Sequence, residues 1–190
     1  NKIELTKEIQ FPHSIGLLYS AVTAHLGFSV NNSEYKVMGL SPYGVMDRKR
    51  NPYYQKFRNI VDIKEDGSYE LDMSYFVYHY KMGMPGSKFI KDFGPIRKKE
   101  SSVEQRHKDI DAGLKMITED IIIGLLNQSY KETKCENVCI AGGCALNSVA
   151  NGKLLKNTPF KEIYIQPNAS DGGTSMGAAF YVYNCILGKD

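Results

Sequence analysis

The fold of this chain is decided by Val138-Cys139-Ile140-Ala141-Gly142-Gly143-Cys144-Ala145-Leu146-Asn147, an apolar run that leads into a glycine pair. The same design recurs in Ile163-Tyr164-Ile165-Gln166-Pro167, which is followed by Asn168-Ala169-Ser170-Asp171-Gly172-Gly173-Thr174. Helical character over residues 146–156, and again over about 174–186, makes this a strand–helix–strand–helix unit. Right-handed crossovers then predict two parallel, adjacent strands. Both glycine loops are expected at one carboxyl edge, where α/β sheets bind ligands, so a nucleotide or phosphate crevice is the first hypothesis.

The first loop, Gly142-Gly143, has two interpretations. Glycines let the backbone approach a flat ligand closely, because no Cβ intervenes and positive φ is accessible. The helix that follows offers unsatisfied N–H groups to an anion or a ribose hydroxyl, and Asn147, one turn inside it, can donate and accept hydrogen bonds. The alternative is a tight strand-to-helix turn whose glycines only permit close packing. Sequence pattern alone leaves these two interpretations balanced.

The second loop adds a carboxylate to the glycine pair Gly172-Gly173. Asp171 is expected either to cap the N-terminus of the following helix or to ligate a metal or orient a substrate at the sheet edge. Neither loop has the GxxxxGK[ST] spacing of a P-loop or the GxGxxG spacing of a dinucleotide-binding site. The sequence therefore predicts a binding edge without a standard phosphate fingerprint.

Bulk composition is that of an ordinary globular domain, with 190 residues, 42% hydrophobic content and a formal charge of +3. This charge is too small to favour nucleic acid, and the run Arg97-Lys98-Lys99 is expected to be a solvated loop. No apolar run has the roughly 20 residues that span a membrane. The cysteines, taken as small apolar filler with Cys139 in a buried strand, favour a reduced, cytoplasmic protein without zinc or disulfides.

Three further segments carry local signals. An amphipathic helix is expected from about residue 15 to 26, with Ser14 as N-cap and Gly27 as stop. Residues 45–100 are interpreted as an insertion with minor structure of its own, including a hairpin around Asp66-Gly67. A long helix follows a capping-box pattern at residues 102–105 and continues to about residue 130, with a stripe of apolar residues: Ile110, Leu114, Ile117, Ile121 and Leu125.

The histidines are scattered and form no HxxxH or HExxH pair, so no self-contained metal site is predicted. His13 lies by a helix start and is the one histidine of functional interest, although an ordinary helix-terminus role is the alternative. His107 is placed on the polar flank of the long helix. Lys36, in Glu34-Tyr35-Lys36, is either part of an exposed ion pair or aimed at a phosphate, and its spacing does not decide between them.

Four blocks of this sequence, in order, resemble the O-carbamoyltransferase family typified by nodulation protein NodU and the cephamycin (CmcH-type) and tobramycin carbamoylating enzymes. The resemblance covers about residues 9–186, with Cys144 and Ser33 standing where valine and glycine are usual. The first block is Phe11-Pro12-His13-Ser14-Ile15-Gly16-Leu17-Leu18-Tyr19-Ser20-Ala21-Val22-Thr23, and the second is residues 34–44. The third is residues 141–147 with 151–154, and the fourth is residues 165–167 and 171–173 with 177–179.

The resemblance implies an α/β, actin-like (ribonuclease H-like) ATPase fold, of which the chain is the later part of the N-terminal catalytic domain. Family members make carbamoyladenylate from carbamoyl phosphate and ATP in a separate C-terminal domain. They then transfer the carbamoyl group to an acceptor hydroxyl in the actin-like domain, which holds a metal, typically iron. Carried over by position, the adenylate side is lined by Gly142, Gly143 and Asn147, while Gly172 and Gly173 accompany the metal-ligand Asp171. Lys36 is assigned to the nucleotide side, without a stated role.

The family's paired metal-binding histidines, early phosphate loops and adenylate-forming domain are absent from this sequence, which starts at Asn1 rather than at a methionine. We therefore expect a domain fragment with poor metal affinity and no carbamoyltransferase activity of its own. Catalytic residues and the acceptor, whether an oligosaccharide, an antibiotic or another sugar, cannot be read from these residues. Two alternatives remain: a sugar-kinase-like or ATPase domain of the same superfold, and a non-catalytic α/β ligand-binding module.

Overall fold

A computed structural model describes residues 2–189, so Asn1, and with it the expectation about the chain start, lies outside the described residues. The chain divides into two compact units, a helical unit of residues 10–134 and a strand unit of residues 2–9 with 135–189. The helical unit contains α1 (Ile15–His25), α2 (Glu34–Leu40), a 3₁₀ turn (Ser41–Tyr43), α3 (Pro52–Ile60), β1 (Val61–Ile63), β2 (Tyr69–Leu71), a second 3₁₀ turn (Met73–Tyr75), α4 (Ser87–Phe93) and α5 (Gln105–Thr133). In the described part of the chain, no helix is both long and apolar enough to cross a bilayer.

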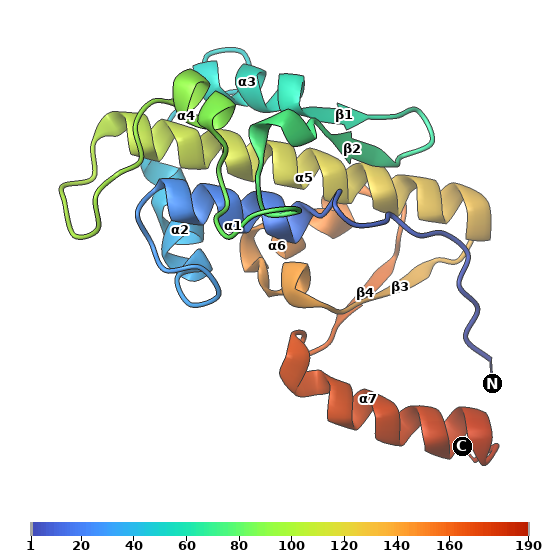
Figure 1. Ribbon diagram of the computed structural model, residues 1–190. Helices are drawn as coiled ribbons and strands as arrows, with labels where there is room; N and C mark the ends of the chain where they lie inside the picture. The colour runs from blue at the N-terminus through green and yellow to red at the C-terminus, as the bar shows by residue number, and fades with distance from the viewer. Residues whose placement is uncertain (1, 190) are drawn as a thin grey trace. The chain divides into compact units, whose positions relative to one another are not determined.

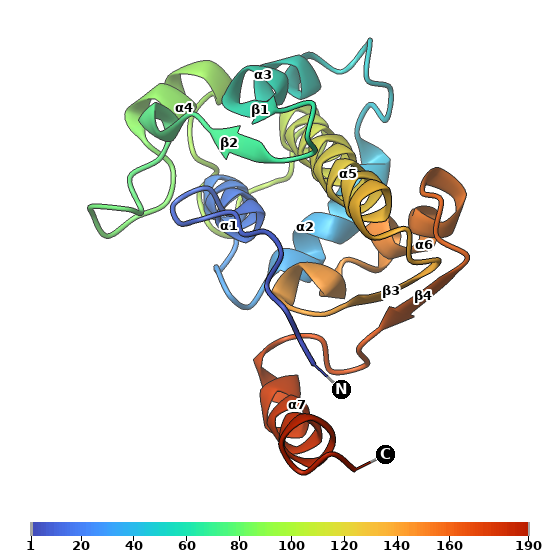
Figure 2. The same ribbon diagram turned by 90° about the vertical axis from the view of Figure 1, so that its right-hand side faces the viewer.

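The long helix α5 is the centre of the helical unit and packs against α3, α2 and α1 (Figures 1 and 2). Its apolar stripe is confirmed at Ile110, Leu114, Ile117 and Ile121, which are fully buried, whereas Leu125 is half-buried. The predicted capping box at residues 102–105 is wrong by two residues. Helix α5 begins at Gln105 with Glu104 as its N-cap, because the His107 ring accepts a hydrogen bond from the Glu104 N–H group and fixes the cap there.

Helix α1 matches its sequence signals closely. Ser14 is the N-cap and its hydroxyl oxygen accepts a hydrogen bond from Leu17 N–H at 3.2 Å. The helix stops at His25, and Gly27, with φ +73°, turns the chain away in a backbone conformation that favours glycine. Local capping chemistry therefore predicted both ends of this helix.

An aromatic core lies between α3, α4 and the second 3₁₀ turn. The rings of Phe89 and Phe93 stack at 4.1 Å, and Phe57 lies 4.8 Å from Phe93. The predicted hairpin is confirmed as antiparallel β1 and β2, with Gly67 at positive φ in the turn. Residues 45–100 thus share one compact unit with α1 and α5, and their status as an insertion stays a prediction.

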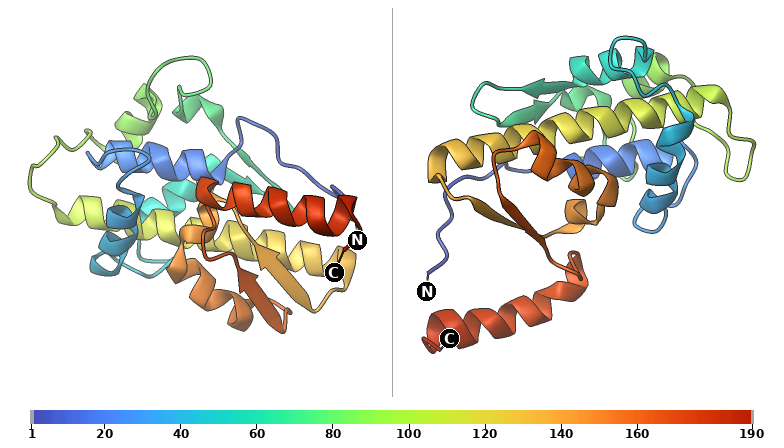
Figure 3. Two further views of the ribbon diagram at one scale, coloured as in Figure 1. Left: turned by 90° about the horizontal axis from the view of Figure 1, so that it is seen from below. Right: turned by 180° about the vertical axis from the view of Figure 1, so that it is seen from behind.

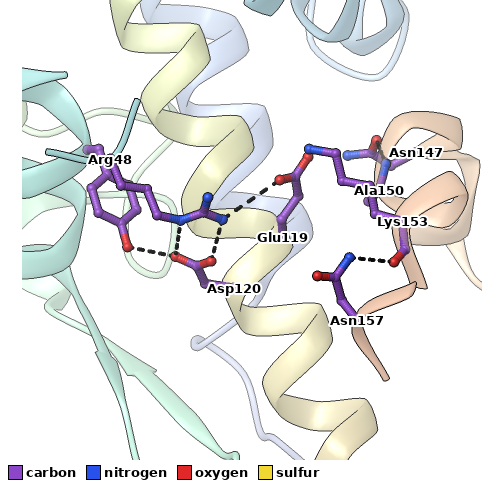
Figure 4. A network of polar contacts seen from close by, with 8 residues as sticks. Arg48, Glu119, Asp120, Asn147, Ala150, Lys153 and Asn157 are labelled. Atoms are coloured by element: carbon purple, nitrogen blue, oxygen red, sulfur yellow. Dashed lines mark hydrogen bonds and ion pairs between the residues drawn. The ribbon is translucent and has the colours of Figure 1, made fainter. Parts of the chain in front are cut away.

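A salt-bridge network joins the loop before α3 to the middle of α5 (Figure 4). Arg48 Nη2 lies 2.6 Å from Asp120 Oδ1, and the Tyr54 hydroxyl donates to the other carboxylate oxygen at 2.7 Å. Glu119, which is almost fully buried, lies 3.9 Å from the same guanidinium. This network fixes the contact between α3 and α5.

Two polar side chains predicted or assumed to be solvated are buried. Arg97 is only 7% exposed, so the solvated-loop interpretation of residues 97–99 holds for Lys98 and Lys99 but is wrong for Arg97. His107 is 3% exposed rather than on a polar flank. Asp111 is fully buried, and burial raises the pKa of its carboxyl to about 8, so it is mainly protonated at neutral pH.

Two glycines of this unit make a matched stability test. A Cβ on Gly44 would lie 2.2 Å from Lys108 O and 2.8 Å from Ala112 Cβ, whereas a Cβ on Gly39, inside α2, meets no described atom within 4 Å. We expect Gly44→Ala to destabilise the chain by about 1–3 kcal/mol through overpacking. We expect Gly39→Ala to stabilise it by up to about 1 kcal/mol through helix propensity. Urea denaturation checks both, and equal midpoints for the two variants would contradict this packing.

The strand unit has the predicted strand–helix–strand–helix order (Figure 3). It contains β3 (Asn137–Ile140), a 3₁₀ turn (Gly143–Leu146), α6 (Ser148–Asn157), β4 (Glu162–Ile165), a 3₁₀ turn (Asp171–Gly173), α7 (Thr174–Phe180) and a π-helical continuation (Tyr181–Ile186). Strands β3 and β4 pair in parallel, with Asn137 opposite Glu162 and Ile140 opposite Ile165. The prediction of two adjacent parallel strands, and of an α/β chain, is confirmed.

Candidate functional site

Both glycine loops leave the carboxyl ends of the paired strands, as the topology predicts. The loop after β3 and the loop after β4 are joined directly, because Gly142 N–H donates to the Ala169 carbonyl at 2.7 Å. Gln166 N–H donates to Ile140 O at 3.1 Å and extends the parallel ladder to this edge. The two loops therefore form one continuous backbone surface at the carboxyl edge of the sheet.

The first loop has glycines that packing does not explain. Gly142 has φ +93°, which accounts for glycine at that position. Gly143 does not have a positive φ, and a Cβ there would meet nothing within 4 Å among the described residues. The close-packing alternative therefore does not account for Gly143, and the space beside it is open to a ligand.

Asn147 is placed differently from its prediction. It is the N-cap of α6 rather than a residue one turn inside the helix, and its Oδ1 accepts a hydrogen bond from Ala150 N–H at 3.1 Å (Figure 4). The 3₁₀ turn from Gly143 to Leu146 separates the glycine pair from the α-helix and causes the shift. The side-chain oxygen caps the helix, and the Asn147 amide N–H₂ group can donate to a ligand.

The glycines of the second loop, unlike Gly143, have other atoms close to the position that a Cβ would take. A Cβ on Gly172 would lie 2.6 Å from the Asn168 side chain, and a Cβ on Gly173 would lie 2.2 Å from Asn168 O. Gly173 is therefore required by the packing of its own loop, because the atom it meets is backbone, whereas at Gly172 the Asn168 side chain can shift to admit a methyl group. Asn168 shapes this loop but was not singled out by sequence reasoning; the Pro167-Asn168 turn signal was the available clue.

Asp171 does not act as the helix N-cap that was its structural alternative. The N-cap of α7 is Gly173, and neither the 3₁₀ turn nor α7 has a side-chain cap hydrogen bond. The Thr174 hydroxyl donates at 2.6 Å to the backbone carbonyl of Asp171, so the carboxylate takes no part in that contact. Asp171 is exposed at the carboxyl edge, and the capping interpretation is wrong.

A metal site is not complete in this part of the protein. Among residues 2–189, no group of three or more histidine, cysteine, aspartate or glutamate side chains is placed to hold a metal ion. Asp171 could supply one oxygen ligand, which suits a hard or borderline cation, but one carboxylate does not hold such an ion alone. The residues present therefore do not fit a self-contained metal centre.

Lys36 and His13 belong to the helical unit. Lys36 lies on α2 with its Nζ 5.9 Å from the centre of the neighbouring Tyr35 ring, and its nucleotide role stays a prediction. His13 Nδ1 accepts a hydrogen bond from Leu71 N–H at 3.0 Å, and the Tyr69 hydroxyl accepts one from Ile15 N–H at 2.9 Å. His13 thus ties the start of α1 to β2, which agrees with the ordinary helix-terminus interpretation.

The cysteines are less buried than expected for apolar filler. Cys135, Cys139 and Cys144 are exposed, and Cys185 is half-buried. Along β3, Val138 and Ile140 are partly covered while Cys139 is on the uncovered face, because side chains alternate along a strand. The expectation of a buried Cys139 is therefore wrong for this chain.

Comparison with known proteins identifies relatives over nearly the whole sequence. The family described as carbamoyltransferase N-terminus matches residues 1–180. The chain is 48% identical over 183 residues to the uncharacterized protein sll1178 of Synechocystis sp.. It is 34% identical over 176 residues to nodulation protein NolO of Bradyrhizobium diazoefficiens, and equally to nodulation protein NolNO of Sinorhizobium fredii.

These alignments cover most of this chain but a minor part of each relative. They include 95% of the chain for the Synechocystis protein and 92% for each nodulation protein. They cover 29%, 29% and 24% of the respective relatives. The chain thus spans less than a third of the length of the curated relatives that it matches.

Proposed function

The chain belongs to the carbamoyltransferase N-terminus family of the NodU type, and on that premise we propose that the full-length protein transfers a carbamoyl group to an acceptor hydroxyl. In this proposal the donor is carbamoyladenylate, formed from carbamoyl phosphate and ATP. The acceptor hydroxyl oxygen attacks the carbamoyl carbon and gives up its proton to solvent, the bond from that carbon to the phosphate oxygen breaks, and AMP leaves with the electron pair. The chain contributes one wall of the nucleotide site in an actin-like domain.

The observation that carries the proposal is the open space beside Gly143. A glycine that neither φ nor packing requires, at the carboxyl edge of a parallel sheet, is what close approach of a planar or anionic ligand needs. Gly142 supplies the turn, and its N–H group is already committed to Ala169 O. In this proposal Gly143 therefore lets the adenylate approach the backbone, and the Asn147 amide N–H₂ group orients it.

Asp171 is proposed as one ligand of a metal, typically iron in this family, whose other ligands come from outside this chain. This role is supported by the carboxylate of Asp171, which is exposed and caps no helix. Because the described residues do not form a metal centre by themselves, no chemical step is assigned to the metal here. Gly173 takes a structural role in this proposal, since the backbone of Asn168 leaves no room for a Cβ there, while Gly172 accompanies the Asp171 ligand.

The proposal is tested with full-length protein supplied with carbamoyl phosphate, ATP and hydroxyl acceptors. We expect AMP and a carbamoylated product, whereas ADP with a phosphorylated acceptor would instead identify the sugar-kinase-like alternative. For Asp171→Asn we expect bound metal and turnover to fall at least about tenfold. The matched control is Glu162→Gln, an exposed carboxyl at the amino end of β4, which should change neither quantity. Unchanged metal content and turnover in Asp171→Asn would remove the metal role.

A further inference from the structure

We propose that the segment between α4 and α5, residues 94–104, is held in place at neutral pH and detaches in acid. We call it the clasp segment, and we call its attachment the clasp. The clasp segment is fastened to the C-terminal end of α1, and two buried histidines must stay neutral for it to remain closed. This device is independent of the carbamoyl-transfer proposal, since it lies within the helical unit and involves none of the proposed site residues.

One end of the clasp segment is fastened by Arg97. Its backbone N–H donates to the His25 carbonyl at 3.0 Å, and its Nε donates to the Leu26 carbonyl at 2.6 Å. The guanidinium also lies 4.8 Å from the centre of the Phe28 ring. A Cβ on Gly27 would be 2.4 Å from Arg97 O, so the close approach of the clasp segment depends on that glycine. The clasp segment is therefore attached to the backbone of His25, a residue whose ring is fully buried.

The beginning of the clasp segment is also held by Arg106, which lies in the first turn of α5. Its Nη1 donates to Phe93 O at 2.9 Å and its Nη2 donates to Pro95 O at 3.1 Å. Gly94, with φ +92°, leaves room for this guanidinium, because a Cβ there would lie 2.8 Å from Arg106 Nη1. Both arginines thus bind neutral backbone carbonyls, which do not cancel their positive charge.

His107 is held where only a neutral ring is tolerated. Its Nδ1 accepts from Glu104 N–H at 2.9 Å, while its Nε2 lies 2.9 Å from Arg106 Nη2, a group that can only donate. A neutral imidazole can accept at one nitrogen only, so one of these contacts is already unfavourable. Protonation would place an N–H opposite a donor at both nitrogens and would remove the cap of α5.

The charged, protonated form of the His25 ring is also disfavoured. The ring is fully buried, packs edge-on against Phe89 at 5.1 Å, and neither ring nitrogen has a partner among the described residues. Burial, followed by the charges of Arg106 and His107, lowers the pKa of His25 to about 4. Burial and Arg106 also lower the pKa of His107, with Arg97 adding to this effect and the Glu104 carboxylate opposing it.

The direction of the pH effect follows from these lowered pKa values. A histidine freed by opening titrates near 6.5, whereas His25 in the closed clasp titrates near 4. The closed state binds fewer protons in that window, so its stability is complete above about pH 6.5 and is lost as pH falls toward 4. At pH 5 this difference for His25 alone corresponds to an approximately 30-fold shift toward the open state.

Amide hydrogen exchange with mass spectrometry on the full-length protein tests the clasp. After correction for intrinsic exchange rates, we expect protection of peptides covering residues 94–107 to fall about 30-fold or more between pH 7.5 and pH 5. The double variant His25→Phe with His107→Gln should keep its protection at pH 5, because glutamine at this position can still accept from the Glu104 N–H. His79→Gln, an exposed histidine, is the matched control and should behave as the native protein does.

A second measurement covers the case in which the double variant fails to fold. Deuterium exchange at the ring C2–H of each histidine, followed by mass spectrometry, reports its pKa in the native protein. A His25 value well below 6.5 supports the clasp, and a value near 6.5 would overturn it. An equal acid-induced loss of protection in the folded double variant would overturn it as well.

Discussion

Replacing Phe57 with alanine is expected to destabilise the chain by about 3–5 kcal/mol, the range for deleting a fully buried phenylalanine side chain. Phe57 has no exposed surface and its ring contacts the stacked pair Phe89 and Phe93. The loss of stability should lie toward the upper end of this range, because the cavity left by the Phe57 ring cannot collapse. A Cβ on Gly113 of α5 would already lie 2.9 Å from Tyr54 N, so α3 cannot move closer to α5.

Urea denaturation of Phe57→Ala, Phe57→Leu and the native chain measures this effect. Leucine refills part of the cavity, so Phe57→Leu should lose less than half as much stability as Phe57→Ala. Tyr80→Ala removes an aromatic ring that is 70% exposed and serves as the matched control, with an expected change within about 0.5 kcal/mol. A loss below about 1 kcal/mol for Phe57→Ala would mean that this aromatic cluster is not the core of the helical unit.

Local signals predicted those parts of the fold in which neighbouring residues decide the structure. Ser14 and Gly27 bound α1 because a cap hydroxyl and a positive-φ glycine act within one turn. The order of the two apolar runs predicted parallel β3 and β4, since a right-handed crossover leaves few other arrangements. Family membership was likewise predictable, because the four shared blocks are continuous stretches of sequence whose order does not depend on long-range contacts.

The predictions from sequence failed where residues outside the local motif decide the structure. Arg97 is buried because carbonyls at the end of α1, some seventy positions earlier, accept from it, and a basic run in sequence contains no sign of this. The start of α5 moved because the His107 ring could replace the usual glutamate of a capping box. For Asp171, the 3₁₀ turn displaced the cap to Gly173, which periodicity does not predict.

Replacing Gly143 with valine is expected to lower kcat/KM for the hydroxyl acceptor about 100-fold in the full-length protein while leaving its thermal unfolding midpoint unchanged. The structure shows no described atom within 4 Å of a Cβ at this position, so under the proposed function a side chain there would meet the adenylate rather than the protein. Gly143→Ala should give a smaller loss, because its methyl group fills less of the space. The matched control is Gly152→Ala in α6, whose Cβ also meets nothing and which should keep full activity.

The opposite result is expected at the second loop, and this contrast separates binding from packing. Gly173→Ala places a Cβ 2.2 Å from Asn168 O, so the loop must shift, and the thermal midpoint should fall before any ligand is added. If Gly143→Val also lowered the midpoint, the first loop would be a packed turn like the second. If Gly143→Val changed neither the midpoint nor kcat/KM, the adenylate would not approach Gly143. Only a loss of turnover without a loss of stability assigns the open side of the first loop to the nucleotide.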